Sequence, residues 1–457
     1  MYTIQYLEQL QQLHHPHRHQ FQQMSSTKSP ILLDGFHLKM NLQKSKGSYI
    51  YDELSDRFIL DFYTSFSSCP VGYNHPDLVK QDLRSIYPNK IANSDIITPE
   101  YDTFVKTFQT CLPPNLQDHL FFVEGGSAAV ENALKAAFDW KIQMLLSNGI
   151  RIDENSLQVI HFKQAFHGRG GYTMSLTNTD PIKTDGFPKF DWPRCQVVPA
   201  LHFKGGLVDN LLDVVEKENA AFEFILNLVK SQTSKQIAAL IIEPIQGEGG
   251  DNHFRGEFLY RLRKLADKYE FLLIFDEVQT GFGTTGRWWC FEHFNVEPDI
   301  LVFGKKTQVC GIAASHRLDL VKSVFNVSGR INSTWGGNLI DMVRCTEIIS
   351  IYEGEKLLER CQKVGARLLK GLIKLEKEGD VISNCRGRGL MIAFDLSSGE
   401  ERDLMWTKLC TGGVLCLKSG TRTIRLRGPL TLTEDEADLG LVVFEKCFGK
   451  NLELSEI

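Results

Sequence analysis

The feature that most restricts the fold is a series of short, almost continuously apolar runs between residues 119 and 312. Longer stretches with helical spacing separate these runs, which occupy residues 120–123, 158–162, 238–242, 271–275 and 300–303. Strands that are covered on both faces lose the alternation of polar and apolar residues and show this texture. Strands that alternate with helices build a mostly parallel sheet. The sequence therefore predicts an α/β domain in this region.

The sequences on either side predict a second layer of structure. Short alternating runs between residues 31 and 62 indicate a small antiparallel unit. Residues 341–376 have the apolar spacing of a long amphipathic helix. Further strands are expected at residues 389–395, 414–417 and 423–427.

The length of the chain makes two or more domains the expectation. With 457 residues, of which 42% are hydrophobic, it can bury an ample core but is too long for one compact domain. We predict that residues 1–75 contribute to a small α+β domain, that residues 76–337 form a large ligand-binding domain, and that residues 338–457 complete the small domain.

Charge and hydropathy argue against two classes of partner. The 51 Lys and Arg residues and the 56 Asp and Glu residues leave a formal net charge of −5, so no basic surface for nucleic acid is expected. No run of 18 or more uncharged apolar residues occurs, and we therefore expect no membrane-spanning helix.

Cysteine usage predicts a reducing compartment. The eleven cysteines are scattered and contain no C-x-x-C pair, which is typical of free thiols. Residues 1–23 lack the apolar segment of a signal peptide, so we expect a cytoplasmic protein. We expect no functional metal site in that polar segment, although it contains His14, His15, His17 and His19.

A first candidate site lies where an apolar strand is followed by Gly125, Gly126 and Ser127 and then by a helical pattern. Glycine lets a ligand approach the backbone closely, and the free N–H groups at the start of a helix favour an anion. The pattern indicates a phosphate site. A pair of glycines alone is more often an ordinary turn.

A second candidate is the acid at the end of the run 271–275. Asp276 and Glu277 stand where the strands of open α/β sheets meet their ligands. A desolvated carboxylate beside a heterocyclic nitrogen favours the protonated ring, whereas a helix cap or an ion-pair partner is the simpler alternative. Residues 281–286 match G-x-G-x-x-G, but they do not open a helix directly after the strand, so we expect a loop.

The third candidate is the lysine pair after the run 300–303. A lysine at the carboxyl edge of a buried strand has a lowered pKa and can form a Schiff base, although Gly304-Lys305-Lys306 alone is more often a solvated turn. The three candidates together supply what pyridoxal phosphate needs: a phosphate cradle, a partner for the pyridine nitrogen and a lysine for covalent attachment.

Several motifs carry a resemblance to a known family. They are residues 166–169, 243–250, 276–281 and 424–427, with longer runs at 122–126, 131–141, 187–193, 303–311 and 332–338. Through the first four the chain resembles the class III (ω-amino acid) aminotransferases of fold type I. Through the longer runs it is most similar to the lysine 6-aminotransferases within that family. The likeness covers nearly the whole chain from about residue 29 onward.

The resemblance implies a pyridoxal phosphate enzyme of fold type I, active as a homodimer with its site at the subunit interface. Lys305 matches the lysine that binds the cofactor and moves the substrate proton, and Asp276 matches the partner of the pyridine nitrogen. The other cofactor-binding matches are Val278 and Phe166 on the two ring faces, Gln279 near the phenolic oxygen, Gly126 and Ser127 at the phosphate, and Thr334, which reaches the phosphate from the second subunit.

The resemblance also implies how two unlike substrates share one site. In this family a glutamate neutralises an arginine while an ω-amine reacts, and swings away when an α-carboxylate arrives; the matches are Glu248 and Arg425. Arg169 matches the residue that binds the distal carboxylate, and Asn332 is expected to bind substrate. Strand alternation places Arg425 and Arg427 on one face, so the pattern alone does not choose between them.

One departure from the family concerns the end of the arginine strand. The family commonly has Pro-Pro-Leu there, whereas this chain has Gly428-Pro429-Leu430, and we expect the change to loosen the strand end.

These matches predict transfer of the ε-amino group of L-lysine to 2-oxoglutarate. The products would be L-glutamate and 2-aminoadipate 6-semialdehyde, which cyclises to piperideine-6-carboxylate. A 4-aminobutyrate or ornithine aminotransferase is the alternative, because it would use the same arginine and glutamate; the runs at 125–127, 307–311 and 335–337 favour lysine. A catalytically inactive relative is a further alternative, against which Lys305, Asp276 and Gln279 together argue.

Overall fold

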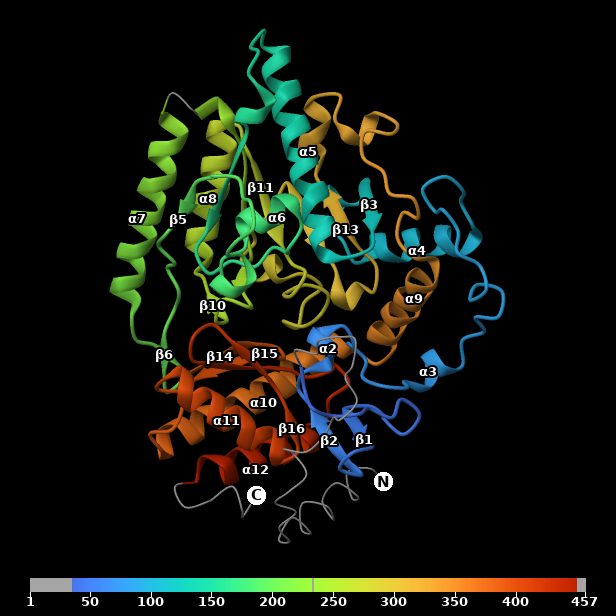
Figure 1. Ribbon diagram of the computed structural model, residues 1–457, viewed down its shortest axis with the longest axis vertical. Helices are drawn as coiled ribbons and strands as arrows, with labels where there is room; N and C mark the ends of the chain where they lie inside the picture. The colour runs from blue at the N-terminus through green and yellow to red at the C-terminus, as the bar shows by residue number, and fades with distance from the viewer. Residues whose placement is uncertain (1–34, 232–233, 450–457) are drawn as a thin grey trace.

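A seven-stranded sheet organises the larger part of the computed structural model, which describes residues 35–231 and 234–449 (Figure 1). The strand order is β3-β13-β12-β11-β8-β4-β5. All neighbours are parallel except the two pairs that β13 forms, with β12 and with β3. The strands are β3 (His119–Val123), β4 (Gln158–Phe162), β5 (Arg194–Cys195), β8 (Ile237–Ile242), β11 (Leu272–Asp276), β12 (Ile300–Phe303) and β13 (Cys310–Ala314). The predicted α/β class with a mostly parallel sheet is confirmed.

All five apolar runs form strands, and their predicted bounds differ from the observed ones by at most one residue. The sequence pattern did not predict β13, because its small residues are typical of a turn. Gly311 lies within this strand at a point of close approach: a Cβ there would lie 2.2 Å from the carbonyl oxygen of Phe121 and 2.8 Å from the ring of Phe303. Small residues thus let β13 fit between two strands that carry large side chains.

The two faces of the sheet are covered by different helices. Ile241 and Ile274 belong to the buried cluster that contains the alanines of α5 (Gly126–Ser147). Leu240 and Leu273, one position earlier on the same strands, belong to the cluster that contains α7 (Leu211–Lys230) and α8 (Gly256–Tyr269). Alternate residues of a strand point to opposite faces, so continuous apolar sequence is required here. Burial of each such side chain contributes about 1.5–3 kcal/mol.

The smaller part contains strands from both ends of the chain. In its three-stranded sheet, β16 (Val414–Leu415) pairs in parallel with β2 (Arg57–Asp61), which pairs with β1 (Tyr49–Asp52). Figure 1 shows the blue N-terminal strands beside the red C-terminal elements. A four-stranded antiparallel sheet lies next to them, formed by β14 (Ser383–Arg388), β15 (Met391–Asp395), β18 (Thr423–Arg427) and β17 (Leu417–Ser419). The predicted division into a large and a small domain, with boundaries at residues 75 and 337, stays a prediction.

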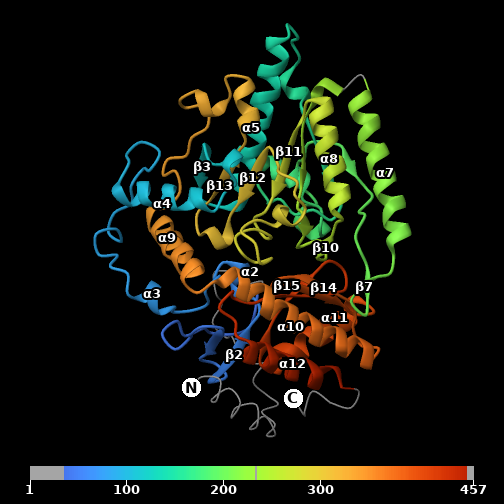
Figure 2. The ribbon, with the colours of Figure 1, turned by 180° about the vertical axis from the view of Figure 1, so that it is seen from behind.

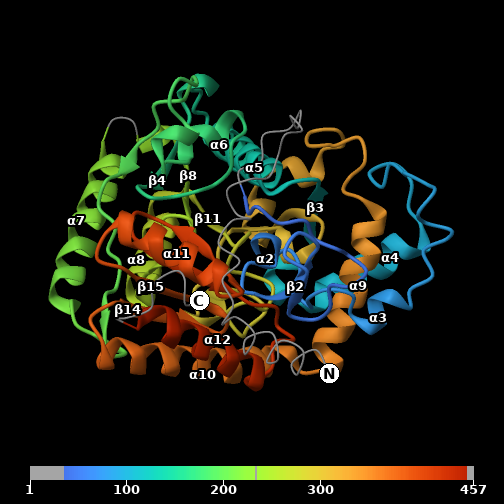
Figure 3. The ribbon, with the colours of Figure 1, turned by 60° about the horizontal axis from the view of Figure 1, so that its bottom comes forward.

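The predicted amphipathic region at residues 341–376 forms two helices. They are α9 (Leu339–Gly354) and α10 (Leu357–Glu378), separated where Lys356 adopts a left-handed conformation with φ 52°. Apolar spacing continues across this two-residue break, so the sequence pattern did not reveal it. α9 packs against α4 (Pro99–Thr110) of the larger part, whereas α10 lies beside α12 (Glu434–Phe448) of the smaller part, as Figures 2 and 3 show.

The remaining described elements complete these layers. They are α2 (Thr64–Ser67), α3 (Pro76–Val79), α6 (Gly171–Leu176), α11 (Gly399–Thr411), β6 (Phe203–Lys204), β7 (Leu207–Val208), β9 (Ile245–Gln246) and β10 (Asn252–His253), together with short 3₁₀ turns. None of the helices in the described ranges is long and apolar enough to cross a membrane.

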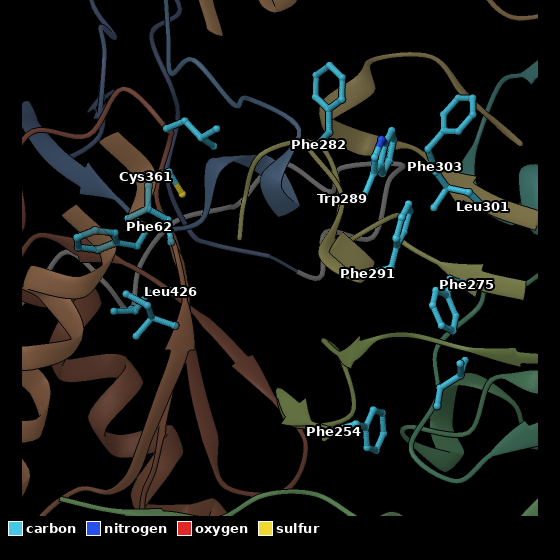
Figure 4. Close-up of a cluster of buried hydrophobic side chains, with 14 of the residues drawn as sticks. Phe62, Phe254, Phe275, Phe282, Trp289, Phe291, Leu301, Phe303, Cys361 and Leu426 are labelled. Carbon is cyan, nitrogen blue, oxygen red and sulfur yellow. The ribbon is translucent and has the colours of Figure 1, made fainter. Parts of the chain in front are cut away.

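One hydrophobic cluster joins the two parts of the molecule. Figure 4 shows Phe62 and Leu426 of the smaller part together with Phe282, Trp289 and Phe303 of the larger part, and all five side chains are buried. Because interiors are densely packed, this shared core resists displacement of one sheet relative to the other. The cluster therefore fixes where β18 lies against the large sheet.

Buried charges join the two parts at a second place. Arg427 of β18 is 1% exposed and forms an ion pair with Asp251, which follows β9 in the larger part. Arg386 of β14 donates hydrogen bonds to the carbonyl oxygens of Gly250 (2.6 Å) and Asp251 (2.9 Å) and pairs with Asp395 (2.9 Å). We define residues 247–251 as the bridging loop, since it is held by the small-domain sheet.

Replacement of Asp251 tests the strength of this connection. Asn tolerates the positive φ of 50° at this position, so Asp251→Asn removes the charge while keeping the backbone. It leaves the buried Arg427 unpaired, and we expect the free energy of unfolding to fall by about 3–5 kcal/mol in urea titrations. Asp438→Asn, in an exposed pair with Arg367, is the control and should shift the midpoint far less. Equal shifts in the two variants would contradict this account.

Candidate active site

The carboxyl ends of three adjacent strands bring titratable side chains to one edge of the large sheet. Asp276 is the last residue of β11 and lies opposite Val302 of β12. Lys305 follows Val302 by three residues. Glu243 directly follows β8, the neighbour of β11 on the other side. Open α/β sheets bind ligands at this edge. The predicted acid and the predicted lysine are thus neighbours, as the strand order requires.

Lys305 is largely buried, and its amine forms no hydrogen bond or ion pair with the described residues. Burial, and secondly the charge of Arg425, lower its pKa from the usual 10.5 to about 8. The negative charges of Asp276, Glu248 and Glu243 raise the pKa of Lys305 and so partly oppose this shift. An amine that is substantially neutral near pH 8 can attack a carbonyl carbon or accept a proton.

The structure separates the two adjacent lysines. The amine of Lys306 donates a hydrogen bond to the carbonyl oxygen of Gln279 (2.8 Å). Burial and the charge of Lys305 keep the pKa of Lys306 well below its usual value. Lys306 therefore supports the loop that contains Gln279, whereas Lys305 is free to react.

A buried histidine orients Asp276. The Nδ1 atom of His167 lies 2.8 Å from Oδ2 of Asp276, and Oδ1 accepts a hydrogen bond from the backbone N–H of Val278 (3.1 Å). The Nε2 atom of His167 is buried and has no partner, so the proton of the neutral ring belongs on Nδ1, where it is donated to Asp276. The sequence motif contained His167, but no role was assigned to it. A buried acid such as Asp276 needs a hydrogen-bond donor, and this requirement was the signal that could have pointed to His167.

The start of α5 lies close to the lysine strand. Gly125 has φ 95°, and the helix begins at Gly126. A Cβ on Gly126 would lie 3.2 Å from Cγ1 of Val278, and one on Gly304 would lie 3.4 Å from the same atom. Val278 therefore packs between the glycine-lined helix start and the residue before Lys305. The first backbone N–H groups of a helix lack intrahelical partners and favour an anion.

The hydroxyl of Ser127 is used within the protein. It accepts hydrogen bonds from the backbone N–H groups of Arg169 (3.2 Å) and Gly170 (3.0 Å) and lies 2.9 Å from Oγ1 of Thr173. A Cβ on Gly168, whose φ is 122°, would lie 2.4 Å from this hydroxyl. Ser127 thus fixes the turn that contains Arg169. Its predicted role at the phosphate stays a prediction. Because its hydroxyl is already used, the backbone N–H of Ser127 is the group that would bind the phosphate.

Glu243 holds two loops of the site together. Its carboxylate accepts hydrogen bonds from the backbone N–H groups of Phe166 (3.1 Å) and Gly247 (3.0 Å), and burial raises its pKa to about 7. Glu243 is the first residue of one of the matching motifs, but no role was predicted for it from the sequence. The loop that it fixes contains Phe166 and continues to Arg169, which is exposed and whose guanidinium has no partner among the described residues.

The small domain contributes a buried arginine. Arg425 of β18, 2% exposed, forms an ion pair with Glu248 and donates a hydrogen bond to Oε1 of Gln279 (3.1 Å). Arg427 instead pairs with Asp251. Of the two arginines, Arg425 is the one that contacts other predicted site residues, which favours it over Arg427; its role stays a prediction.

The expected loosening after β18 is not observed. The backbone N–H of Arg427 donates to the carbonyl oxygen of Phe62 (2.8 Å), and that of Leu430 donates to Pro70 (2.7 Å). A Cβ on Gly428 would lie 3.2 Å from the ring of Phe62. Close packing and two backbone hydrogen bonds thus hold the strand end in place.

Glu248 has a second cationic partner that the sequence did not predict. The amine of Lys183 lies 2.7 Å from its Oε1 atom. Burial raises the pKa of Glu248, but Arg425 and Lys183 together outweigh this effect and lower it. Lys183 lies outside all the matching motifs, so no sequence signal marked it.

Two predicted residues lie apart from this cluster within one chain. Asn332 and Thr334 are exposed on the segment before α9 and form no hydrogen bond or ion pair with the other predicted site residues that the structure describes. Their predicted roles, and the contribution of Thr334 to a second subunit, stay predictions.

One group of potential metal ligands lies at the opposite edge of the sheet. His119 at the start of β3 lies 2.9 Å from Asp319, and His316 lies 3.3 Å from the same carboxylate. These side chains form ion pairs with one another. The four N-terminal histidines considered above lie outside the described residues.

Comparison with known proteins agrees with this site. The family model for class III aminotransferases matches residues 34–448. The L-lysine-epsilon aminotransferase of Amycolatopsis lactamdurans is 45% identical over 419 residues, covering 90% of this chain and 92% of the relative. The 4-aminobutyrate aminotransferase of Saccharomyces cerevisiae is 34% identical over 432 residues, covering 89% of each.

A solved structure shows the same fold. Lysine aminotransferase from M. tuberculosis, in the internal aldimine form, superposes with a TM-score of 0.86 and 44% sequence identity. The match covers 92% of this chain and 96% of that protein. The predicted fold type I class and the predicted family are thereby confirmed. This chain belongs to the class III aminotransferases.

Proposed function

We propose that this protein transfers the ε-amino group of L-lysine to 2-oxoglutarate, with pyridoxal phosphate as cofactor. The observation that carries the proposal is the ion pair of Arg425 and Glu248 at the sheet edge that presents Lys305 and Asp276. A lysine-specific relative is 45% identical to this chain, against 34% for a 4-aminobutyrate aminotransferase, which supports lysine as the donor.

The residues at this edge fit pyridoxal phosphate. The lack of a side chain at Gly126 lets Val278 pack closely against the start of α5, whose free backbone N–H groups would hold a phosphate. The carboxylate of Asp276 has accepting capacity left after its two bonds, and the Lys305 amine is unpaired. When bound, the cofactor withdraws electrons from the substrate carbon that carries the nitrogen.

Two side chains of the protein control the protons of the reaction. Asp276, held by His167, stabilises a proton on the pyridine nitrogen because a buried carboxylate favours an adjacent cation. Lys305 would move the proton between the substrate carbon and the cofactor's aldehyde carbon. Its lowered pKa of about 8 keeps a substantial neutral fraction near physiological pH.

Arg425 and Glu248 allow one site to accept two kinds of substrate. While they are paired, their charges cancel, and a terminal CH₂–NH₂ group meets no excess charge. A dicarboxylate brings an α-carboxylate that competes with Glu248 for the guanidinium. We expect Arg169, which is exposed and whose guanidinium has no partner among the described residues, to bind the distal carboxylate, since a guanidinium suits bidentate binding.

The active unit proposed here is a homodimer in the cytoplasm. Thr334 is exposed on its own chain and would reach the phosphate of the second subunit. The structure contains eleven unpaired cysteines, which supports a reducing compartment.

Donor turnover tests the proposed reaction. With 2-oxoglutarate as acceptor, we expect L-lysine to give a higher kcat/KM than ornithine or 4-aminobutyrate, with a semialdehyde product that cyclises. Lys305→Ala should abolish turnover of all three donors, because it lacks the amine that attaches the cofactor and moves the proton. A clear preference for 4-aminobutyrate or ornithine would contradict lysine as the donor.

The pH dependence of cofactor attachment tests the state of Lys305. Below its pKa of about 8 the amine is protonated and cannot attack an aldehyde, so attachment should quicken with rising pH and level off above about 8. Stopped-flow absorbance after adding pyridoxal phosphate to cofactor-free protein measures the rate. A rise that continues toward pH 10.5 would show that the site does not lower this pKa.

Thr334 tests the shared site. If its hydroxyl binds the phosphate across the interface, Thr334→Val should weaken pyridoxal phosphate binding roughly tenfold, about the effect of one hydrogen bond to a charged group. The protein should still sediment as a dimer. Ser333→Ala is the matched control and should bind as the wild type does. A monomer in sedimentation, or unchanged affinity in Thr334→Val, would exclude this role.

A further inference from the structure

Lys183 and Arg425 each contact one carboxylate oxygen of Glu248. Lys183 ends the short 3₁₀ turn η3 (Pro181–Lys183), and its amine contacts Oε1 of Glu248 at 2.7 Å. Arg425 reaches the other oxygen, Oε2, from the small-domain sheet. Each carboxylate oxygen therefore has its own cation, and the two cations come from different parts of the molecule.

The ion pair of Lys183 and Glu248 is partly buried. The Lys183 and Glu248 side chains are 15% and 23% exposed. The Lys183 amine also lies 3.2 Å from Oγ1 of Thr179 and 5.6 Å from the centre of the Phe166 ring. Ion pairs that are shielded from water are screened less than surface pairs. Lys183 is therefore a fixed electrostatic partner of Glu248.

This arrangement bears on the second half of the proposed reaction. When a dicarboxylate binds Arg425, Glu248 must give up that guanidinium. Leaving a partly buried carboxylate without a partner is costly. Lys183 provides a partner that Glu248 keeps during the exchange, so release of Arg425 does not leave the glutamate unpaired.

We propose that Lys183 is a positioning residue that retains Glu248 when Arg425 is transferred to the substrate α-carboxylate, and so favours the dicarboxylate half-reaction. This inference rests on the proposed function. Lys183 acts through Glu248 and contacts neither substrate. Without it, Glu248 would have Arg425 as its remaining ion-pair partner and would compete more strongly with the incoming carboxylate.

Separate measurement of the two half-reactions tests this role. Holoenzyme is mixed with L-lysine or with L-glutamate, and the cofactor absorbance change is followed at increasing substrate concentration. In Lys183→Met we expect the apparent affinity for glutamate to fall roughly tenfold, as for loss of a partly buried charge pair. The response to lysine should change less than twofold, and Lys183→Arg should restore glutamate affinity.

A neighbouring lysine provides the matched control. Lys189 lies in the same loop and is exposed. Its amine donates a hydrogen bond to the carbonyl oxygen of Thr184 (2.5 Å) and not to Glu248. Lys189→Met should leave both half-reactions unchanged. If it reproduces the effect of Lys183→Met, or if Lys183→Met weakens both half-reactions equally, loop order explains the data and the inference is overturned.

A double-mutant cycle separates action through Glu248 from direct substrate binding. In a Glu248→Gln background, Lys183→Met should change glutamate affinity less than twofold, because the residue through which it acts has lost its charge. A persisting tenfold loss would mean that Lys183 binds the carboxylate itself. If the wild type prefers another ω-amine to lysine, the proposed donor fails, while this comparison stands with that amine in place of lysine.

Discussion

The structure depends on the bridging loop, residues 247–251, being held by charges from the smaller domain. Arg386 and Arg427 bind its last two residues, and Arg425 binds Glu248, its second residue. All three arginines are buried, so each requires its partner within the protein. The contacts that join the two parts of the molecule are therefore also the contacts that shape the candidate substrate site.

Burial sets the chemistry of the sheet edge. Lys305, Glu243 and Glu248 lie together in a region that water reaches poorly, and each has a pKa shifted from its usual value. Burial lowers the pKa of Lys305, with the charge of Arg425 as the second cause, and raises the pKa of Glu243. Glu248 lies between two cations, which outweigh burial and lower its pKa. One desolvated edge can thus present a neutral amine beside an ionised carboxylate.

Local patterns predicted the parts of the fold that depend on local rules. The central strands followed from continuous apolar runs, and the helix start at Gly126 followed from its glycines. The pattern failed at β13, where small residues are required by close packing against Phe121 and Phe303, and at Lys356, where a backbone reversal interrupts helical spacing without changing it. Both failures concern contacts or torsions that no short sequence window contains.

The sequence by itself determined the chemistry of this protein: a lysine and an acid at adjacent strand ends, a glycine-lined helix start, and motifs that resemble one family. Only the tertiary structure distinguished the two arginines of β18. Arg425 and Arg427 share a strand face, and their roles differ because Glu248 faces one and Asp251 the other. It also revealed His167 and Lys183, since a side chain acquires a partner of opposite charge only when distant segments are folded against each other.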